Sequence, residues 1–239
     1  MSSNKSSIIR LAKDVKSIIK NPLENHNIYY RHDEENICKG YALIIGNSDT
    51  PYDSGYYFFE FNYSDNYPFE PPTVIFKTCD GMTRFNPNLY INGKVCLSIL
   101  NTWNGEGWTS CQTISSVLLV LSSILNSNPL TNEPGIKMTN LDNDNYNYLL
   151  TYKNIEFSII KQIECINDNL NSSLKNFKQF QSIINKKFIE NQEKILENLN
   201  KIKHLDKQTI RVNVYNLNQF IDINKLINKL NKLNKLNKK

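Results

Sequence analysis

The chain has 239 residues, a formal net charge of +5 and a hydrophobic fraction of 40%, so it is long enough to bury a full core without disulfide support. Its five cysteines show neither a Cys-x-x-Cys pair nor zinc-finger spacing, which argues against a disulfide scaffold or metal site and favours a reducing compartment. The N-terminus lacks a signal-peptide pattern, and no apolar stretch is long enough to span a bilayer. We expect a soluble intracellular protein, cytoplasmic or nuclear, or one in the host cytosol if an intracellular parasite or virus encodes it.

Charge and helix-breaking residues divide the chain at the same place. Residues 1–165 carry 13 Lys and Arg against 17 Asp and Glu, a net charge of −4, whereas residues 166–239 carry 15 against 6, a net charge of +9. All eight prolines and all eight glycines precede residue 136. Because these residues mark turns, we expect a mixed α and β core at residues 1–168, followed by a basic, all-helical extension at residues 169–239.

The core is predicted to begin with an amphipathic helix over residues 7–20, where apolar residues recur at helical spacing between possible serine caps and Pro22. Four segments rich in Tyr, Ile and Phe follow, separated by turn residues, and we expect strands there: residues 27–31, 38–46, 56–63 and 73–77. Short loops join them, which predicts a four-stranded antiparallel meander packed by helices on one face, an α+β fold. The third segment is too aromatic for one of its faces to be fully exposed to water.

Helical patterns dominate the rest of the chain. We expect one helix over about residues 112–126 and another over about residues 143–167, and helical patterns continue beyond residue 171. The final Asn-Lys-Leu repetition is either a short amphipathic helix or frayed. The basic tail lacks tryptophan and any recognisable nucleic-acid module, so we expect neither a nucleic-acid partner nor a membrane partner.

Two side chains that could take part in a reaction share the irregular stretch from residue 85 to residue 98. Asn88 follows Pro87 directly, and Cys96 lies eight residues further on. Pro87 prevents a helix there, and Gly93 supplies a turn. A cysteine followed by leucine is more often a small buried hydrophobe than a nucleophile, so the stretch alone leaves both interpretations open.

The sequence on both sides of this stretch resembles that of the ubiquitin-conjugating enzymes. The matching segments are Tyr-Pro-Phe-Glu-Pro-Pro at 67–72, the stretch itself, and Trp-Thr-Ser-Cys-Gln-Thr-Ile-Ser-Ser-Val-Leu at 108–118. The family signature is His-Pro-Asn, eight residues to the active cysteine, then a tryptophan opening a helix. Asn86 stands at the histidine position, as in the subgroup called ubiquitin-conjugating enzyme Z. The resemblance covers roughly residues 40–135. Further likeness to that subgroup lies in Gly93–Leu100, Thr102-Trp103 and Asn132-Glu133-Pro134-Gly135.

The resemblance implies a thioester carrier. Cys96 would accept ubiquitin or a ubiquitin-like protein from an activating enzyme and pass it to substrate lysines, with no cofactor of its own, because ATP is used by the activating enzyme. Asn88 matches the family asparagine credited with stabilising the developing oxyanion. The loop that carries an acid in the family has none at the expected place here, so Glu133 is the nearest candidate. Asn86, Thr131 and Glu133 are the weaker candidates for residues that assist Cys96 and Asn88.

The resemblance also implies two contact surfaces. Lys13 and Lys16 on the first helix are candidates for binding the activating enzyme. Phe69 and Ser110 lie in loops that dock a ubiquitin ligase in the family. Ser110 and Cys111 replace a proline and an alanine found in many relatives, so the ligase remains an optional partner.

An insertion of about four residues separates Cys96 from Trp108, the residue matched to the family tryptophan. Trp103 in this insertion is either a wall facing the substrate or a buried anchor under the loop, and general burial habits favour the anchor. Two alternatives to the thioester carrier remain. One is a non-catalytic adaptor that binds ubiquitin or a ligase. The other is a cysteine hydrolase, which the histidine positions 26, 32 and 204 disfavour.

Overall fold

A computed structural model describes residues 2–168 and 174–236. Four strands form an antiparallel meander in the order β1-β2-β3-β4. The register pairs Leu43 with Phe58 across β2 and β3, and Phe59 with Phe76 across β3 and β4. The meander predicted from the sequence is therefore confirmed. Its strands are β1 (Ile28–His32), β2 (Lys39–Ile45), β3 (Tyr56–Asn62) and β4 (Thr73–Phe76).

Helices flank the meander close to their predicted positions. Helix α1 (Ser2–Lys20) begins earlier than expected, and helix α2 (Ile114–Ser123) lies inside the expected range. Thr113 caps α2, because its side-chain oxygen accepts the Ser116 backbone N–H at 3.3 Å. Single-turn 3₁₀ helices occupy the intervening loops: η1 (Glu24–His26), η2 (Ser98–Leu100) and η3 (Pro129–Asn132).

The helix expected over residues 143–167 is one helical run with a change of winding in the middle. It consists of α3 (Asp142–Lys153), the π-helix η4 (Asn154–Lys161) and α4 (Gln162–Asn167). Asn154, at the change, is buried; it accepts the Tyr57 hydroxyl at 2.6 Å and donates to the Asp53 carbonyl at 2.8 Å. These bonds attach the run to β3 and to the loop before it.

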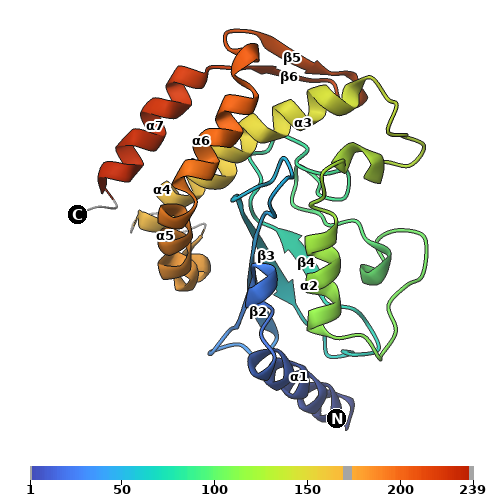
Figure 1. Cartoon of the computed structure of the whole chain (residues 1–239). Coiled ribbons are helices and arrows are strands. Elements are labelled where there is room, and N and C mark those ends of the chain that lie inside the picture. Colours follow the sequence, from blue (N-terminus) through green and yellow to red (C-terminus); the bar gives the residue numbers. More distant parts are fainter. Residues whose placement is uncertain (1, 169–173, 237–239) are drawn as a thin grey trace.

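The C-terminal extension is mostly helical, but the expectation that it is entirely helical is wrong, because it also contains two strands. Its strands Thr209–Val212 (β5) and Leu217–Phe220 (β6) form an antiparallel hairpin that lies along α3 (Figure 1). The turn ends at Asn216, with a φ of +51°, which asparagine adopts more readily than most residues. The turn contains neither Gly nor Pro, so it carries no strong turn signal that would predict a hairpin. The other elements are η5 (Lys175–Phe180), α5 (Gln181–Glu190), α6 (Gln192–Lys201), η6 (Lys203–Leu205), η7 (Asn213–Tyr215) and α7 (Ile223–Leu236).

The Asn-Lys-Leu repetition forms helix α7, so of the two interpretations the amphipathic helix is correct. Leu226, Leu230 and Leu233 are buried along one side of it. Residues from both expected parts of the chain belong to one hydrophobic core. The domain boundary at residue 168 stays a prediction, and residues 169–173 beside it lie outside the described part of the chain.

Helices cover both faces of the sheet, which corrects the expectation of one covered face. Figure 1 shows α2 on one side of the sheet and α5 with α6 on the other. Phe177 of the extension packs on Phe58 with ring centroids 4.8 Å apart and on Tyr41 at 5.4 Å. Phe58 and Phe59 point to opposite faces of β3, yet both are fully buried. A strand that is apolar on both faces needs cover on both.

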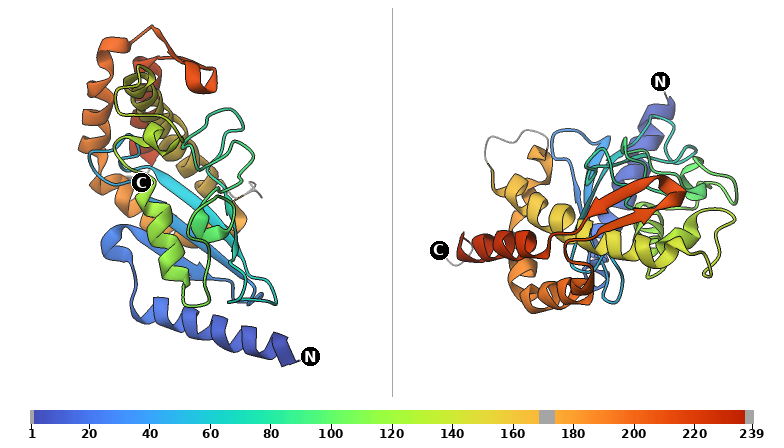
Figure 2. Two further views of the ribbon diagram at one scale, coloured as in Figure 1. Left: turned by 90° about the vertical axis from the view of Figure 1, so that its right-hand side faces the viewer. Right: turned by 90° about the horizontal axis from the view of Figure 1, so that it is seen from above.

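Within residues 2–168 and 174–236, no helix is both long and apolar enough to cross a membrane. All five cysteines belong to this part of the chain, and none of them forms a disulfide bond. Helix α1 lies at the opposite end of the molecule from the hairpin β5–β6 (Figure 2).

Candidate active site

Backbone hydrogen bonds fold the stretch around Cys96 into a compact loop. The Cys96 N–H donates to the Asn88 carbonyl oxygen at 2.8 Å, and Leu89 pairs with Val95 as an isolated β-bridge. Gly93 closes the turn between them at a φ of +87°, a conformation that favours glycine. Asn88 and Cys96 are therefore neighbours in space, as their shared stretch led us to expect.

The thiol of Cys96 lies under the inserted loop of residues 101–107. Cys96 is 4% exposed, and its Sγ donates to the Thr102 carbonyl oxygen at 3.0 Å. The Thr102 hydroxyl accepts the Leu97 N–H and donates to the Val95 carbonyl, both at 2.9 Å. Thr102 thus joins the loop to the backbone on both sides of the cysteine. Sequence reasoning missed this residue, because a carbonyl contact leaves no trace in residue type.

Asn88 contacts the cysteine through its carboxamide as well as its backbone. Its Nδ2 donates to the main-chain oxygen of Cys96 at 2.8 Å. Its Oδ1 is buried and has no hydrogen-bond partner among the described residues. A buried acceptor without a partner costs about 1–3 kcal/mol, so the site keeps one amide oxygen ready to accept a hydrogen bond.

Asn86, at the family's histidine position, is fully buried and fully bonded. Its Nδ2 donates to the Tyr52 hydroxyl at 2.9 Å and to the Ile124 carbonyl at 2.8 Å. Its Oδ1 accepts the Asn88 N–H at 3.0 Å and, at 3.4 Å, Nδ2 of Asn132. Asn86 therefore connects the active stretch, α2 and η3, and it orients the backbone of Asn88.

The two tryptophans have opposite environments. Trp108 is 9% exposed, and its Nε1 donates to the Pro68 carbonyl at 2.6 Å. Trp103 is 49% exposed on the inserted loop. The anchor interpretation of Trp103 is therefore wrong, and the buried anchor is Trp108. The reason is spacing: Asn101 accepts the Trp108 N–H at 2.8 Å and closes the loop, which leaves Trp103 on its outside.

The two auxiliary candidates in the loop after α2 do not contact Cys96. The Thr131 hydroxyl donates to the Asn128 carbonyl at 2.7 Å. The Glu133 carboxylate accepts the hydroxyl of Tyr215, at 2.5 Å, from the C-terminal extension. Both are half-buried. Their neighbour Asn132 reaches Asn86, so they lie one contact removed from the active stretch.

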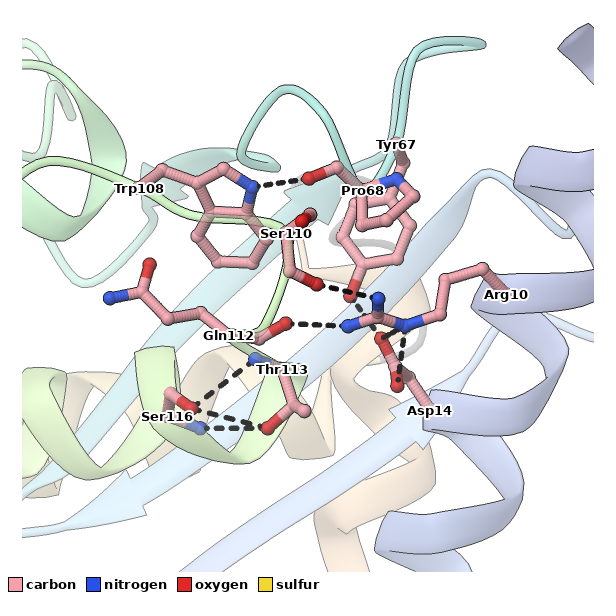
Figure 3. Close-up of polar contacts among 9 residues, drawn as sticks. All are labelled: Arg10, Asp14, Tyr67, Pro68, Trp108, Ser110, Gln112, Thr113 and Ser116. Atoms are coloured by element: carbon pink, nitrogen blue, oxygen red, sulfur yellow. Dashed lines mark hydrogen bonds and ion pairs between the residues drawn. The ribbon is translucent and has the colours of Figure 1, made fainter.

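An arginine network joins α1 to the loop that contains Ser110 (Figure 3). Arg10 donates to the Ser110 carbonyl at 2.6 Å and to the Gln112 carbonyl at 2.7 Å, and it pairs with Asp14 at 3.1 Å. Asp14 also accepts the hydroxyl of Tyr67, the residue before Pro68. Arg10 lies within the helix predicted over residues 7–20, but its residue type alone does not indicate that it fixes this loop.

The four residues assigned to contact surfaces lie around this network. Lys13 and Lys16 are exposed on α1, and Phe69 is 79% exposed beside Pro68. Ser110 is exposed and offers its carbonyl to Arg10. The structure therefore places Lys13, Lys16, Phe69 and Ser110 where another protein can reach them.

No histidine contacts Cys96 among the described residues. His32 bonds the Tyr30 hydroxyl at 2.9 Å and the Ile37 carbonyl at 2.7 Å, the His204 ring packs on Tyr148, and His26 is exposed. Within the described ranges, no group of three or more His, Cys, Asp or Glu side chains is arranged to hold a metal ion. The described functional groups of the site are the Cys96 thiol and the Asn88 carboxamide, which contacts the main-chain oxygen of Cys96.

Comparisons with known proteins agree with this geometry. The sequence model of the family described as "Ubiquitin-conjugating enzyme" matches residues 10–154. The chain is 39% identical over 160 residues to "Ubiquitin-conjugating enzyme E2 Z" of Xenopus tropicalis. The aligned residues cover 66% of this chain and 50% of that protein. It is 38% identical over 194 residues to a protein of Acanthamoeba polyphaga mimivirus whose name begins "Probable ubiquitin-conjugating enzyme", covering 77% of this chain and 13% of that one.

Among solved structures, a ubiquitin-conjugating enzyme E2 from Plasmodium falciparum is 28% identical, with a TM-score of 0.43, covering 50% of this chain and 97% of that one. The chain spans half or slightly less of the length of the E2 Z relatives it matches. The family match covers the sheet, the active stretch and α2. The chain belongs to the ubiquitin-conjugating enzyme family, within its Z subgroup.

Proposed function

We propose that this chain carries ubiquitin or a ubiquitin-like protein as a thioester on Cys96. In the first step the Cys96 thiolate attacks the thioester carbonyl on an activating enzyme. A new C–S bond forms, the old one breaks, and the activating enzyme's cysteine leaves as a thiolate. The exchange is thiol for thiol, so it needs no strong base at the site and no oxidant or reductant.

The second step passes the acyl group to a substrate lysine. The amine attacks the Cys96 thioester, a C–N bond forms, the C–S bond breaks, and the proton that the amine loses passes to the departing Cys96 thiolate, directly or through water. Negative charge develops on the carbonyl oxygen during this step, and a neutral amide donor suits it. The single observation that supports the proposal is the 2.8 Å hydrogen bond from Nδ2 of Asn88 to the main-chain oxygen of Cys96, because it brings an amide donor into contact with the residue that carries the reacting sulfur.

Loading changes the contact that covers the thiol. Cys96 donates its proton to the Thr102 carbonyl in this structure, and neither a thiolate nor a thioester has that proton. The bond is therefore lost in both reacting states, and Sγ is free to turn away from Thr102. The contact that is lost belongs to the exposed loop of residues 101–106.

The partners follow from the same proposal. The activating enzyme, which uses the ATP, binds at α1 through Lys13 and Lys16, and a ligase docks at Phe69 and the Ser110 loop. The chain itself needs no cofactor, metal, membrane or nucleic acid. Its place of action is a reducing intracellular compartment.

A loading assay tests the proposal. The purified chain is incubated with ATP, an activating enzyme and a panel of modifiers, and adducts are separated with and without thiol. We expect an adduct that thiol removes, lost in Cys96→Ala and kept in Cys111→Ala, because Cys111 is an exposed thiol outside the active stretch. An adduct that persists in Cys96→Ala refutes the assignment. If the wild-type chain loads none of the modifiers, the result favours the non-catalytic adaptor instead.

A further inference from the structure

The turn of the C-terminal hairpin is fixed beside the active stretch. Asp142, the first residue of α3, is 5% exposed and accepts two hydrogen bonds from that turn. They come from Nδ2 of Asn213 at 3.0 Å and the backbone N–H of Val214 at 2.9 Å. A buried carboxylate with two donors is a strong attachment, so the next residue, Tyr215, has a defined position.

Tyr215 points from this turn toward the catalytic core. Its hydroxyl donates to Glu133 at 2.5 Å, and its ring packs on Tyr146 with centroids 5.6 Å apart. Burial, and then the bond to Glu133, raise the pKa of Tyr215 above its ordinary value. The hydroxyl therefore stays protonated and remains a donor to the carboxylate.

The second neighbour of Tyr215 is Arg84, at the entry to the active stretch. The guanidinium carbon of Arg84 lies 3.5 Å from the centroid of the Tyr90 ring and 5.5 Å from that of Tyr215. Its nitrogens donate to the carbonyls of Asn86 at 3.2 Å and Pro87 at 2.5 Å. A guanidinium that packs against two aromatic rings and donates two hydrogen bonds has little freedom to rotate, so it fixes the peptides before Asn88.

Two series of contacts therefore connect Tyr215 with Asn86. One passes through Arg84 to the Asn86 and Pro87 carbonyls. The other passes through Glu133 and its neighbour Asn132, which donates to Asn86 Oδ1 at 3.4 Å. Asn86 Oδ1 in turn accepts the Asn88 N–H.

We propose that Tyr215 of the C-terminal extension is a positioning residue for acyl transfer, which acts by holding Arg84 and Glu133 so that Asn88 keeps its orientation toward Cys96. This inference rests on the proposed function. It assigns the extension a part in positioning the site, because Tyr215, which contacts Arg84 and Glu133, belongs to the hairpin. Loading does not use the Asn88 donor in the proposed scheme, so Tyr215 acts on the second step.

The test separates loading from discharge in the full chain. Wild type, Tyr215→Ala, Tyr215→Phe and the control Val214→Ala are loaded with modifier, and discharge is followed over a range of free lysine concentrations. Val214 is exposed next to Tyr215, and the alanine variant keeps the backbone bond to Asp142. Tyr215→Phe keeps the ring contacts with Arg84 and Tyr146 and loses only the bond to Glu133.

We expect all four proteins to load at the same rate. The maximal discharge rate of Tyr215→Ala should fall roughly tenfold, the effect of losing about 1.4 kcal/mol of positioning, while the lysine concentration at half-maximal rate stays unchanged. Tyr215→Phe should lie between Tyr215→Ala and wild type, and Val214→Ala should match wild type. Discharge at the wild-type rate by both Tyr215 variants overturns the inference and leaves the loading proposal intact. Absence of loading in the wild-type chain overturns both.

Discussion

Asn86 donates a hydrogen bond from its side-chain Nδ2 to the hydroxyl oxygen of Tyr52 at 2.9 Å, and that hydroxyl donates in turn to the Phe85 carbonyl at 2.7 Å. Both side chains are fully buried. The tyrosine oxygen thus supplies the acceptor that an amide at this position needs, and the Phe85 carbonyl accepts the hydrogen bond of the tyrosine hydroxyl. The departure from the family's histidine is accommodated by a complete set of partners rather than by a gap.

Asn86→Ala should lower the free energy of unfolding by about 3 kcal/mol, because it leaves buried donors and acceptors without partners. Urea denaturation measures the change. Asn104→Ala is the control, since Asn104 is exposed on the inserted loop, and it should leave the midpoint unchanged. Equal midpoints for the two variants contradict the bonding role of Asn86.

Asn88→Ala should load modifier normally and discharge it slowly to lysine. An oxyanion donor is worth roughly 2.7 to 4 kcal/mol in other enzymes, a factor of about 10² to 10³ in rate. Single-turnover discharge of the loaded chain gives the rate, and a thermal melt of the same sample reports any loosening of the stretch. A variant that melts earlier but discharges like wild type reduces the Asn88 carboxamide to a scaffold for the Cys96 carbonyl.

The sequence predicted the parts of the site that lie close together along the chain. Asn88 and Cys96 share one irregular stretch with Pro87 and Gly93, so the sequence led us to expect them as neighbours, and the Asn88 carboxamide contacts the main-chain oxygen of Cys96. Contacts that reach the stretch from distant elements were not predicted. Tyr215 belongs to a hairpin whose strands have four residues each, too short for alternation to stand out from the helical patterns around it.

In the fold, too, local features were predicted and contacts between distant segments were not. Each strand of the meander was predicted from its own residues, whereas the cover on the second face depends on which distant segment packs there. The aromatic run of β3 indicated that one face of it would not be fully exposed to water, and the structure buries both Phe58 and Phe59. Nothing local to β3 identifies Phe177 as the residue that covers Phe58, because such pairing is a property of the folded chain.

Phe177→Ala tests the cover that the extension provides. Phe177 is 2% exposed and packs on Phe58, Tyr41 and Phe180. Its truncation should lower the free energy of unfolding by about 3–5 kcal/mol, the usual cost of such a cavity. Phe220→Ala, also in the extension but half-exposed, is the matched control. Equal effects in denaturant titrations would show that the extension does not stabilise the sheet.

Arg10→Lys tests the network that joins α1 to the Ser110 loop. Lysine cannot donate to the Ser110 and Gln112 carbonyls together in the planar geometry of a guanidinium. We expect slower loading from the activating enzyme, with unchanged discharge from a preloaded chain, because the network lies at the proposed docking surface and not at Cys96. Lys20→Arg, at an exposed position at the end of α1, is the control for a charge-conserving exchange on the same helix. Unchanged loading in Arg10→Lys contradicts this role of the network.

His32 gives the stability of the sheet a pH dependence of known sign. Burial lowers the pKa of His32 below its ordinary value of 6.5, against opposing effects of the Ile37 carbonyl and Asp33. The unfolded chain therefore binds this proton more readily than the folded chain, so stability is full above the unfolded pKa and falls as the pH decreases through about 6.5 toward the lower folded pKa. His32→Gln should flatten the dependence of melting temperature on pH between about 7.5 and 5.5, whereas His26→Gln, at an exposed position, should retain it. A wild-type melting temperature that rises as the pH falls through this window contradicts the sign.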